Sequence, residues 1–322
     1  MGLQQEHCFY SPEGPKRRSV VFGDWFLEAA PDAVWRQARR VVEIGAGSGR
    51  LLGELAQRFP GSEFVGFEPH REAAARARGT GLALYDSWSE LGTGFDLAYS
   101  VAVVEHVASP TAFLQGIATR LRPGGKLLLS QPTQDVPSYD VFFVDHLHHF
   151  GGAHLRRYAR KCGFDEEKVL IGHPLMPNFS LHLWRREEVP VAEEEGEWRG
   201  PKAVTTCAEM AQRVLQDMAH VDALLVRLLK EGRRVAVFGL REVYWLARCY
   251  STVGDFPFVC GLDDEPDRPE YADLGFPVLC PEDCLSLGVQ EVILAMNALY
   301  YPAARERLGR LGLASHPVLG GA

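Results

Sequence analysis

Apolar runs and amphipathic stretches alternate through the first half of the chain. Residues 41–44 form a short, mostly apolar run that predicts a buried strand. Leu52, Leu55 and Phe59 then recur at helical spacing. The alternation continues to about residue 130 and predicts βαβ crossovers and a parallel sheet. In such a sheet, ligands bind at the carboxyl ends of the strands.

The first 39 residues are polar at the start and helical in pattern afterwards. Phe22, Trp25, Phe26 and Ala29 lie at helix-like spacing. We expect a helical leader, which either covers a ligand pocket or simply packs against the domain that follows.

An α/β pattern returns in the second half of the chain. A period of three to four between apolar positions predicts one long amphipathic helix from residue 203 to residue 231. Strand-like runs follow at residues 233–239, 258–266, 276–279 and 291–297. They predict a second, smaller Rossmann-like domain. Its first turn contains only Gly239, which is too little glycine to hold a dinucleotide of its own.

These patterns divide the chain into four expected segments. They are a helical leader at 1–39, a first α/β domain at 40–188, a linker at 189–202, and a long helix with the second α/β domain at 203–322. The linker is assigned from its acidic, proline-containing composition.

The composition narrows the class of protein. The 322 residues are 46% hydrophobic and 24% charged, which suits a soluble protein with two cores. The net charge of −8 offers no basic surface to nucleic acid, and we expect residues 16–18 to form a solvated arm. The seven dispersed cysteines suit a reducing compartment. No apolar run reaches the ~18 residues of a membrane helix, so we expect a cytoplasmic protein without a membrane partner.

A glycine-rich turn follows the first predicted strand. Gly45, Gly47 and Gly49 alternate after Glu43 in an E-x-G-x-G-x-G pattern. Glycine permits positive φ and lets the backbone lie against a ligand. Glu68 ends the next predicted strand, about where an acid meets a ribose in dinucleotide folds. These residues predict a nucleotide-binding turn, although a plain strand-to-helix turn would also account for the glycines alone.

The pattern resembles motif I of the class I S-adenosylmethionine-dependent methyltransferases, with Glu68-Pro69 in place of the family's ribose-binding acid. Residues 85–88, 94–107 and 121–129 resemble three further motifs of that family, in the same order. The resemblance implies a class I methyltransferase (Rossmann-like) domain that binds S-adenosyl-L-methionine. The cofactor-binding residues it implies are Glu43, Gly45, Ala46, Gly47, Gly49, Glu68, Pro69, Asp86, Ser87 and Ser100.

Residues 139–150 hold the densest set of reactive side chains. His146 is a candidate general base, because imidazole titrates near neutral pH and Asp145 could fix its tautomer. A structural or pocket-lining histidine is the alternative. No metal site is expected, because His146, His148 and His149 cannot all point the same way on a strand.

The chain also resembles the nucleotide-sugar C-methyltransferases, which have a second Rossmann-like domain. The residues that carry this resemblance are Tyr139-Asp140, Phe143-Val144-Asp145-His146, Ser180-Leu181, Asp263-Asp264-Glu265-Pro266 and Asn297. It implies His146 as the base with Asp145 beside it. The residues that we assign to substrate binding are His149, Asp263, Asp264 and Asn297, with a simple turn-capping role as the alternative for Asp263 and Asp264. The chain differs from this family at Phe143, where the family has tyrosine, and at Asp145, where it has glutamate. We do not expect the family's amino-terminal zinc domain here.

We therefore expect methyl transfer from S-adenosylmethionine to a small molecule, with a nucleotide-linked sugar as the leading acceptor. O- or N-methylation of a non-sugar metabolite is one alternative. A cofactor-binding module without turnover, inside a biosynthetic assembly, is another. The sequence leaves the acceptor atom, the nucleotide and the oligomeric state open.

Overall fold

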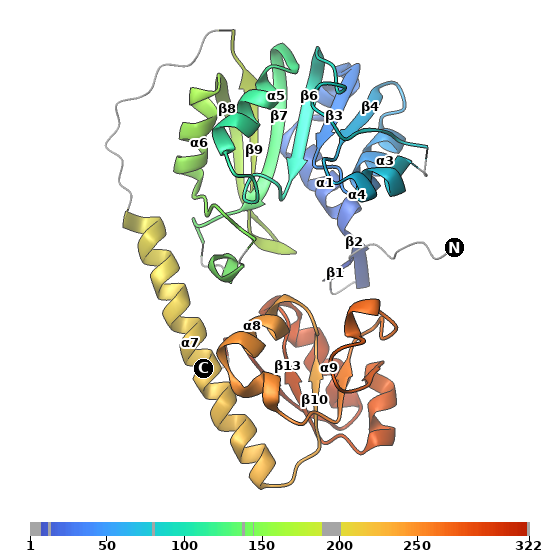
Figure 1. Cartoon of the computed structure of the whole chain (residues 1–322), viewed down its shortest axis with the longest axis vertical. Helices are drawn as coiled ribbons and strands as arrows, with labels where there is room; N and C mark the ends of the chain where they lie inside the picture. Colours follow the sequence, from blue (N-terminus) through green and yellow to red (C-terminus); the bar gives the residue numbers. More distant parts are fainter. Residues whose placement is uncertain are drawn as a thin grey trace. The chain divides into compact units, whose positions relative to one another are not determined.

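The computed structural model describes residues 8–11, 14–78, 81–136, 139–143, 145–188 and 201–320. Its internal contacts divide the chain into two units, Met1–Ala208 and Glu209–Ala322 (Figure 1). Residues 189–200, which make up most of the predicted acidic linker, lie outside the described residues.

A seven-stranded mixed sheet forms the centre of the first unit. Its strands are β3 Arg40–Ile44, β4 Glu63–Phe67, β5 Ala83–Tyr85, β6 Phe95–Val101, β7 Leu121–Pro132, β8 Phe164–His173 and β9 Met176–Arg186. They lie in the order β5-β4-β3-β6-β7-β9-β8 (Figure 1). The strands β3 to β7 are parallel, and β9 runs antiparallel to both β7 and β8. The predicted α/β fold is confirmed, and β8 and β9 add an antiparallel pair to the parallel strands.

Helices cover both faces of this sheet. They are α1 Arg18–Ala29, α2 Asp32–Gln37, α3 Arg50–Arg58, α4 Arg71–Arg78, α5 Pro110–Ala118 and α6 Gly152–Lys161, with a short 3-10 turn, η1, at Tyr139–Phe142. One core lies between the sheet and α1 to α3 and includes Leu128. The other lies between the sheet and α5 and α6 and includes Leu127. These adjacent β7 residues face opposite cores, as the period of two along a strand requires.

The helix α1 contributes bulky side chains to the first core. Phe22 and Phe26 are fully buried. The ring of Phe26 lies 5.5 Å from that of Tyr99, and the ring of Phe22 lies 6.1 Å from that of Phe179. The helix of the predicted leader therefore packs as part of the domain core. A two-stranded hairpin precedes it, made of β1 Cys8–Ser11 and β2 Gly14–Arg17.

The second unit has a five-stranded parallel sheet, as predicted. Its strands are β10 Val235–Phe238, β11 Cys260–Leu262, β12 Val278–Leu279, β13 Glu291–Leu294 and β14 Ala314–Pro317. They lie in the order β12-β11-β10-β13-β14. The helices of this part of the chain are α7 Pro201–Lys230, α8 Glu242–Tyr250 and α9 Tyr301–Arg310, and the 3-10 turns are η2 Thr252–Asp255, η3 Pro269–Tyr271, η4 Pro281–Leu287 and η5 Ala298–Tyr300.

The long helix α7 is amphipathic, as its sequence period predicts. Val214, Met218 and Leu225 are buried on one face, whereas Leu215 and Leu229 remain exposed. None of the helices in the described part of the chain has the length and hydropathy that a bilayer-spanning segment needs.

Candidate active site

The predicted glycine turn lies at the carboxyl edge of the first sheet, between β3 and α3. The backbone N–H groups of Gly45 and Ala46 donate to the carbonyl of Phe67 at 2.8 and 3.0 Å. The N–H of Gly47 donates to Oε2 of Glu68 at 2.8 Å. The turn is therefore held by hydrogen bonds to the end of β4, the neighbouring strand.

The three glycines serve different purposes. Gly45 has φ +81°, and a Cβ there would lie 2.3 Å from Cγ2 of Val103. Gly49 has φ +72°, and its Cβ would lie 2.6 Å from Leu82. Gly47 has φ +51°, but its Cβ would meet no described atom within 4 Å. Gly45 and Gly49 are thus required because a side chain there would clash with the protein itself. Gly47 instead borders open space on the side where a ligand would lie.

Glu68 links the turn to the adjacent strand. Its Oε1 accepts from the N–H of His70 at 2.9 Å, while Oε2 accepts from Gly47. The N–H of Glu68 donates to the carbonyl of Tyr85 at 2.9 Å, which places Asp86 directly beside it. Carboxylates from two neighbouring strands therefore meet at the same edge as the glycine turn. Of the other predicted cofactor residues here, Pro69 is exposed and Ser87 is half-buried.

Two further predicted cofactor residues, Glu43 and Ser100, are buried in the strands β3 and β6 beside the turn. Glu43 is buried, and its carboxyl accepts from the hydroxyl of Tyr99 at 3.2 Å. Burial raises the pKa of Glu43 to about 8, so this carboxyl is mainly protonated at neutral pH. The hydroxyl of Ser100, also buried, donates to the carbonyl of Ile44 at 2.8 Å. Both side chains support the turn from below, and their contact with a cofactor remains a prediction.

This edge fits a cofactor that carries a nucleoside. The open space over Gly47 admits a ligand against the backbone, and Glu68 offers carboxylate oxygens to hydroxyl groups beside it. Asp86 and Ser87 follow at the end of the next strand. No side chain of the turn fills this space, because the turn consists of small residues.

The buried carboxylate of Asp140 binds two histidines of the segment at residues 145–150, which we call the histidine segment. Asp140 is 2% exposed, and its Oδ1 accepts a hydrogen bond from Nδ1 of His146. Its Oδ2 accepts from Nδ1 of His149 at 2.7 Å. Burial alone would raise the pKa of Asp140, but the bonds to the two imidazoles outweigh burial and hold it below the usual value. Burial would likewise lower the pKa of His146, but the bond to Asp140 outweighs it and raises that pKa.

Asp145 does not make the contact that the sequence analysis assigned to it. Its side chain is 71% exposed, and a carboxylate oxygen lies 3.6 Å from Nδ1 of His106. The backbone carbonyl of Asp145 accepts from the same nitrogen at 2.8 Å. Asp140 thus takes the place expected of Asp145 at His146, and the carboxylate of Asp145 is exposed instead.

The histidine segment is attached to the turn that follows β6. The N–H groups of Leu147 and His148 donate to the carbonyl of Glu105 at 2.8 and 3.1 Å. The same turn contains Val103, which abuts Gly45 of the glycine turn. Residues 102–107 therefore lie between the expected cofactor site and the histidines, and they bring the two together at one edge of the sheet.

The sequence analysis missed two residues of this cluster, His106 and the buried Glu105. Glu105 is the more unusual of the two. Its side chain is 1% exposed, and neither carboxylate oxygen accepts a hydrogen bond from another described residue. Burial raises its pKa to about 7, although His106 and His146 act in the opposite direction. One donor atom from each of these three side chains lies within 4.8 Å of the other two. A sequence separation of 40 residues hides this proximity, and only the adjacent Glu-His pair could have signalled it.

The predicted substrate residues of the second unit are engaged within the protein. Asp263 accepts from the hydroxyl of Tyr271 at 2.8 Å and from a backbone N–H at 2.9 Å. Burial raises the pKa of Asp263. Asp264 pairs with Arg307 at 2.5 Å, and Asn297 caps the turn η5. These side chains close turns at the carboxyl ends of β11 and β13, and a role in substrate binding remains a prediction.

The first turn of the second unit is filled by protein. Gly239 has φ +87°, and a Cβ there would lie 2.9 Å from both the carbonyl oxygen of Ala295 and Cβ of Met296. This glycine allows the chain after β10 and the chain after β13 to approach closely. That the second unit holds no dinucleotide of its own remains a prediction.

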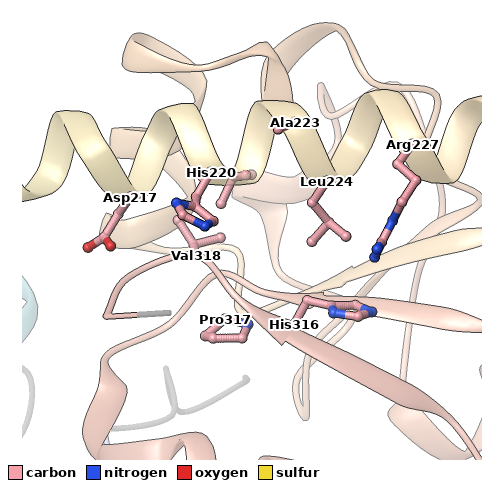
Figure 2. Close-up of a pocket in the computed structure, with 9 residues that line it drawn as sticks. Asp217, His220, Ala223, Leu224, Arg227, His316, Pro317 and Val318 are labelled. Atoms are coloured by element: carbon pink, nitrogen blue, oxygen red, sulfur yellow. The ribbon is translucent and has the colours of Figure 1, made fainter. Parts of the chain in front are cut away.

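A pocket of about 420 Å³ lies between α7 and β14 in the second unit. Figure 2 shows His220 and Arg227 of α7 extending toward His316 and Pro317 of β14. Asp217, at one end, accepts from the N–H of Gly320 at 2.9 Å. The pocket contains none of the residues that the sequence analysis assigned to a site.

Comparison with known proteins identifies the first unit. Residues 16–169 match a family model described as a methyltransferase domain. A ubiquinone biosynthesis O-methyltransferase of Aeromonas salmonicida is 25% identical over 143 residues, which are 41% of this chain and 57% of that protein. One from Cereibacter sphaeroides is 32% identical over 115 residues, which are 33% and 46%. The chain thus spans about half the length of the curated relatives it matches.

Two solved structures of methyltransferases show partial similarity to the first unit. An S-adenosylmethionine-dependent methyltransferase from Mesorhizobium loti is 19% identical, and the match covers 46% of this chain and 90% of that one with a TM-score of 0.39. Magnesium protoporphyrin IX methyltransferase from Synechocystis, with bound S-adenosylhomocysteine, is 15% identical, covering 52% and 81% with a TM-score of 0.41. Together with the match to the family model, the sheet and the glycine turn confirm the predicted S-adenosylmethionine-dependent methyltransferase domain and its cofactor.

Proposed function

We propose that this chain, whose first unit is a class I S-adenosylmethionine-dependent methyltransferase domain, methylates a small molecule bound at the histidine cluster. The observation that carries the proposal is the turn at residues 102–107. It contacts Gly45 on one side and holds the histidine segment on the other. A methyl donor over the glycine turn and an acceptor beside His146 would therefore be neighbours, and methyl transfer depends mainly on such positioning.

The cofactor residues are proposed as the sequence resemblance implies. The backbone around Gly47 would lie against the cofactor, Glu68 would accept from its ribose hydroxyls, and Asp86 would accept from its adenine amino group. When bound, S-adenosylmethionine supplies an electrophilic methyl group on its sulfonium. The buried, protonated Glu43 adds no negative charge to the turn at neutral pH.

His146 is proposed as the base that takes the proton of the acceptor. Its Nδ1–H is committed to Asp140, so the lone pair of the neutral imidazole lies on Nε2. Nε2 has no hydrogen-bond partner among the described residues and can accept a proton as the methyl group arrives. Asp140 is a positioning residue that fixes this tautomer. Asp145, the partner expected from the sequence, instead orients His106.

A nucleotide-linked sugar remains the acceptor that we propose first. The support is the ordered set of sequence matches, with His149 in the first unit and Asp263, Asp264 and Asn297 in the second. O-methylation of a non-sugar metabolite is the second candidate, and the similarity to ubiquinone biosynthesis O-methyltransferases favours it. A silent cofactor-binding module is the third. It would leave the bond between Asp140 and His146 without a catalytic task.

Transfer of a labelled methyl group tests the proposal. The full chain would be incubated with methyl-labelled S-adenosylmethionine and panels of thymidine- and uridine-diphosphate sugars, phenols and amines. We expect one panel to become labelled, and His146→Asn to lower the rate by about 10²- to 10⁴-fold, the usual contribution of a general base. His148→Ala, in the same segment, is the matched control and should stay within a few fold. Labelling that is unaffected by His146→Asn would reject the base, and tight cofactor binding without any labelling would favour the silent module.

A further inference from the structure

Glu105 presents a buried carboxyl group that the proposed methyl transfer does not explain. A carboxylate removed from water costs several kcal/mol unless it is paired or coordinated. Neither oxygen of Glu105 accepts a hydrogen bond from another described residue, and the side chain is almost fully buried. The groups that face it are two imidazoles, those of His106 and His146. A cation held among these three side chains would satisfy the carboxylate.

Both imidazoles are oriented as metal ligands are. A metal-binding histidine usually donates its second ring N–H to a carboxylate or a backbone carbonyl. Nδ1 of His146 donates to the carboxylate of Asp140, and Nδ1 of His106 donates to the carbonyl of Asp145. Each bond leaves Nε2 with the lone pair that coordinates an ion. The two rings are 4.7 Å apart between centroids, in an edge-to-face arrangement.

We propose that Glu105, His106 and His146 bind a divalent transition-metal ion, of which Zn²⁺ is the best match. Two imidazoles and one carboxylate are typical ligands for zinc and its neighbours, whereas calcium and magnesium prefer oxygen alone. Three protein ligands leave a fourth position open, as in metal sites that exchange ligands with solvent. Asp140 and Asp145 would hold the ligands in place without touching the ion.

The geometry needs only a small adjustment to accept the ion. The three donor atoms are now up to 4.8 Å apart, and tetrahedral zinc requires donors about 3.4 Å apart. Side-chain rotations that move the donor atoms by ~1 Å would close this gap. The site is open to solvent on one side, because the side chain of His106 is 36% exposed. An ion can therefore enter without unfolding the segment.

The proposed metal site shares His146 with the proposed function, and its expected effect on methyl transfer rests on that function. The ion would occupy Nε2 of His146, which is the atom proposed to accept the acceptor's proton. Ion and proton then compete for one lone pair. We expect Zn²⁺ to bind in the absence of any substrate, and to slow methyl transfer reversibly as the site fills.

Metal binding can be measured without a substrate. The full chain, without a polyhistidine tag, would be stripped by a chelator and titrated with Zn²⁺, with Co²⁺ as a probe whose visible absorption reports the ligands. We expect one equivalent to bind at micromolar concentration or below. Glu105→Gln, His106→Ala and His146→Ala should each weaken binding by about 100-fold or more, and Asp140→Asn by about 10- to 100-fold. His148→Ala should bind like wild type, and circular dichroism would show that each variant is folded.

Two results would overturn the inference. One is that the stripped chain takes up no Zn²⁺ at micromolar concentrations. The other is that binding survives Glu105→Gln and His146→Ala, which would place the ion elsewhere, for example on cysteines. Neither result affects the methyl-transfer assay, and a chain that fails to methylate any acceptor can still be titrated with metal. The two proposals therefore fail separately.

Discussion

The imidazole of His146 and the carboxylate of Asp140 are joined through Nδ1 and Oδ1, and the second oxygen of Asp140 accepts from His149 at 2.7 Å. One buried carboxylate thus orients two imidazoles. It lies in the 3-10 turn η1, and the histidines follow within nine residues. This local arrangement sets the tautomer of His146 before any substrate arrives.

The first prediction concerns this carboxylate. Asp140→Asn should lower the rate of methyl transfer by about 10²-fold, because the amide can donate to Nδ1 and so favour the wrong tautomer. The control is Asp145→Asn, whose side chain is mostly exposed and should change the rate less than about threefold. The measurement is the initial rate of labelled methyl transfer under saturating cofactor. Equal losses in the two variants would contradict the role given to Asp140.

The second prediction concerns the packing of the glycine turn. Gly45→Ala should destabilise the chain by about 1–3 kcal/mol, because its φ is positive and the new methyl group would overlap Val103. Gly53→Ala, inside α3 with no atom near its Cβ, should instead stabilise it by up to about 1 kcal/mol. Urea unfolding followed by tryptophan fluorescence gives both values. A neutral Gly45→Ala would mean that Val103 can move aside.

The third prediction concerns Glu68. Glu68→Gln keeps the size of the side chain but removes its charge, and one oxygen that accepts from Gly47 or His70 becomes an amide. We expect affinity for S-adenosylhomocysteine to fall about tenfold, since hydrogen bonds to a charged group contribute about 1.5–3 kcal/mol. Glu63→Gln, at the exposed start of β4, should leave the affinity unchanged. Calorimetric titration of the two variants decides the matter, and equal affinities would remove Glu68 from the cofactor site.

The fourth prediction follows from the buried carboxyl of Glu43. Its pKa is about 8 in the folded chain, against 4.5 when unfolded, because burial disfavours the charged form. Between pH 4.5 and 8 the Glu43 carboxyl therefore keeps a proton in the folded state that it loses in the unfolded state. The stability that this carboxyl contributes is complete below pH 4.5 and disappears as the pH rises through 8. Between these values wild type should lose about 1.4 kcal/mol per pH unit relative to Glu43→Gln. Urea unfolding of both proteins at several pH values tests this, and parallel pH profiles would contradict it.

Much of the fold could be predicted because its signals are local. The E-x-G-x-G-x-G spacing, the strand-like runs around it and the ordered motifs up to residue 130 lie within single elements or the turns between them. The same holds for α7, whose apolar period appears directly in the sequence. Such patterns report secondary structure and the end of the sheet at which a ligand binds.

The histidine cluster could be predicted only in part. His146 stood out by its chemistry, but its partner depends on how residues 140–146 turn, and adjacency in sequence suggested Asp145 instead. Glu105 and His106 belong to the turn after β6 and meet His146 only in the folded sheet. The metal ligands proposed here therefore could not be found from the spacing of histidines within one segment.

Cofactor binding can be measured by titrating the full chain with S-adenosylmethionine and S-adenosylhomocysteine in a calorimeter, alone and in the presence of thymidine or uridine diphosphate. We expect micromolar binding of both cofactor forms, weakened by Gly45→Ala and Glu68→Gln and unchanged by Glu63→Gln. A response to the nucleotide would support a nucleotide-linked acceptor. Failure of the folded chain to bind either cofactor form would contradict the account.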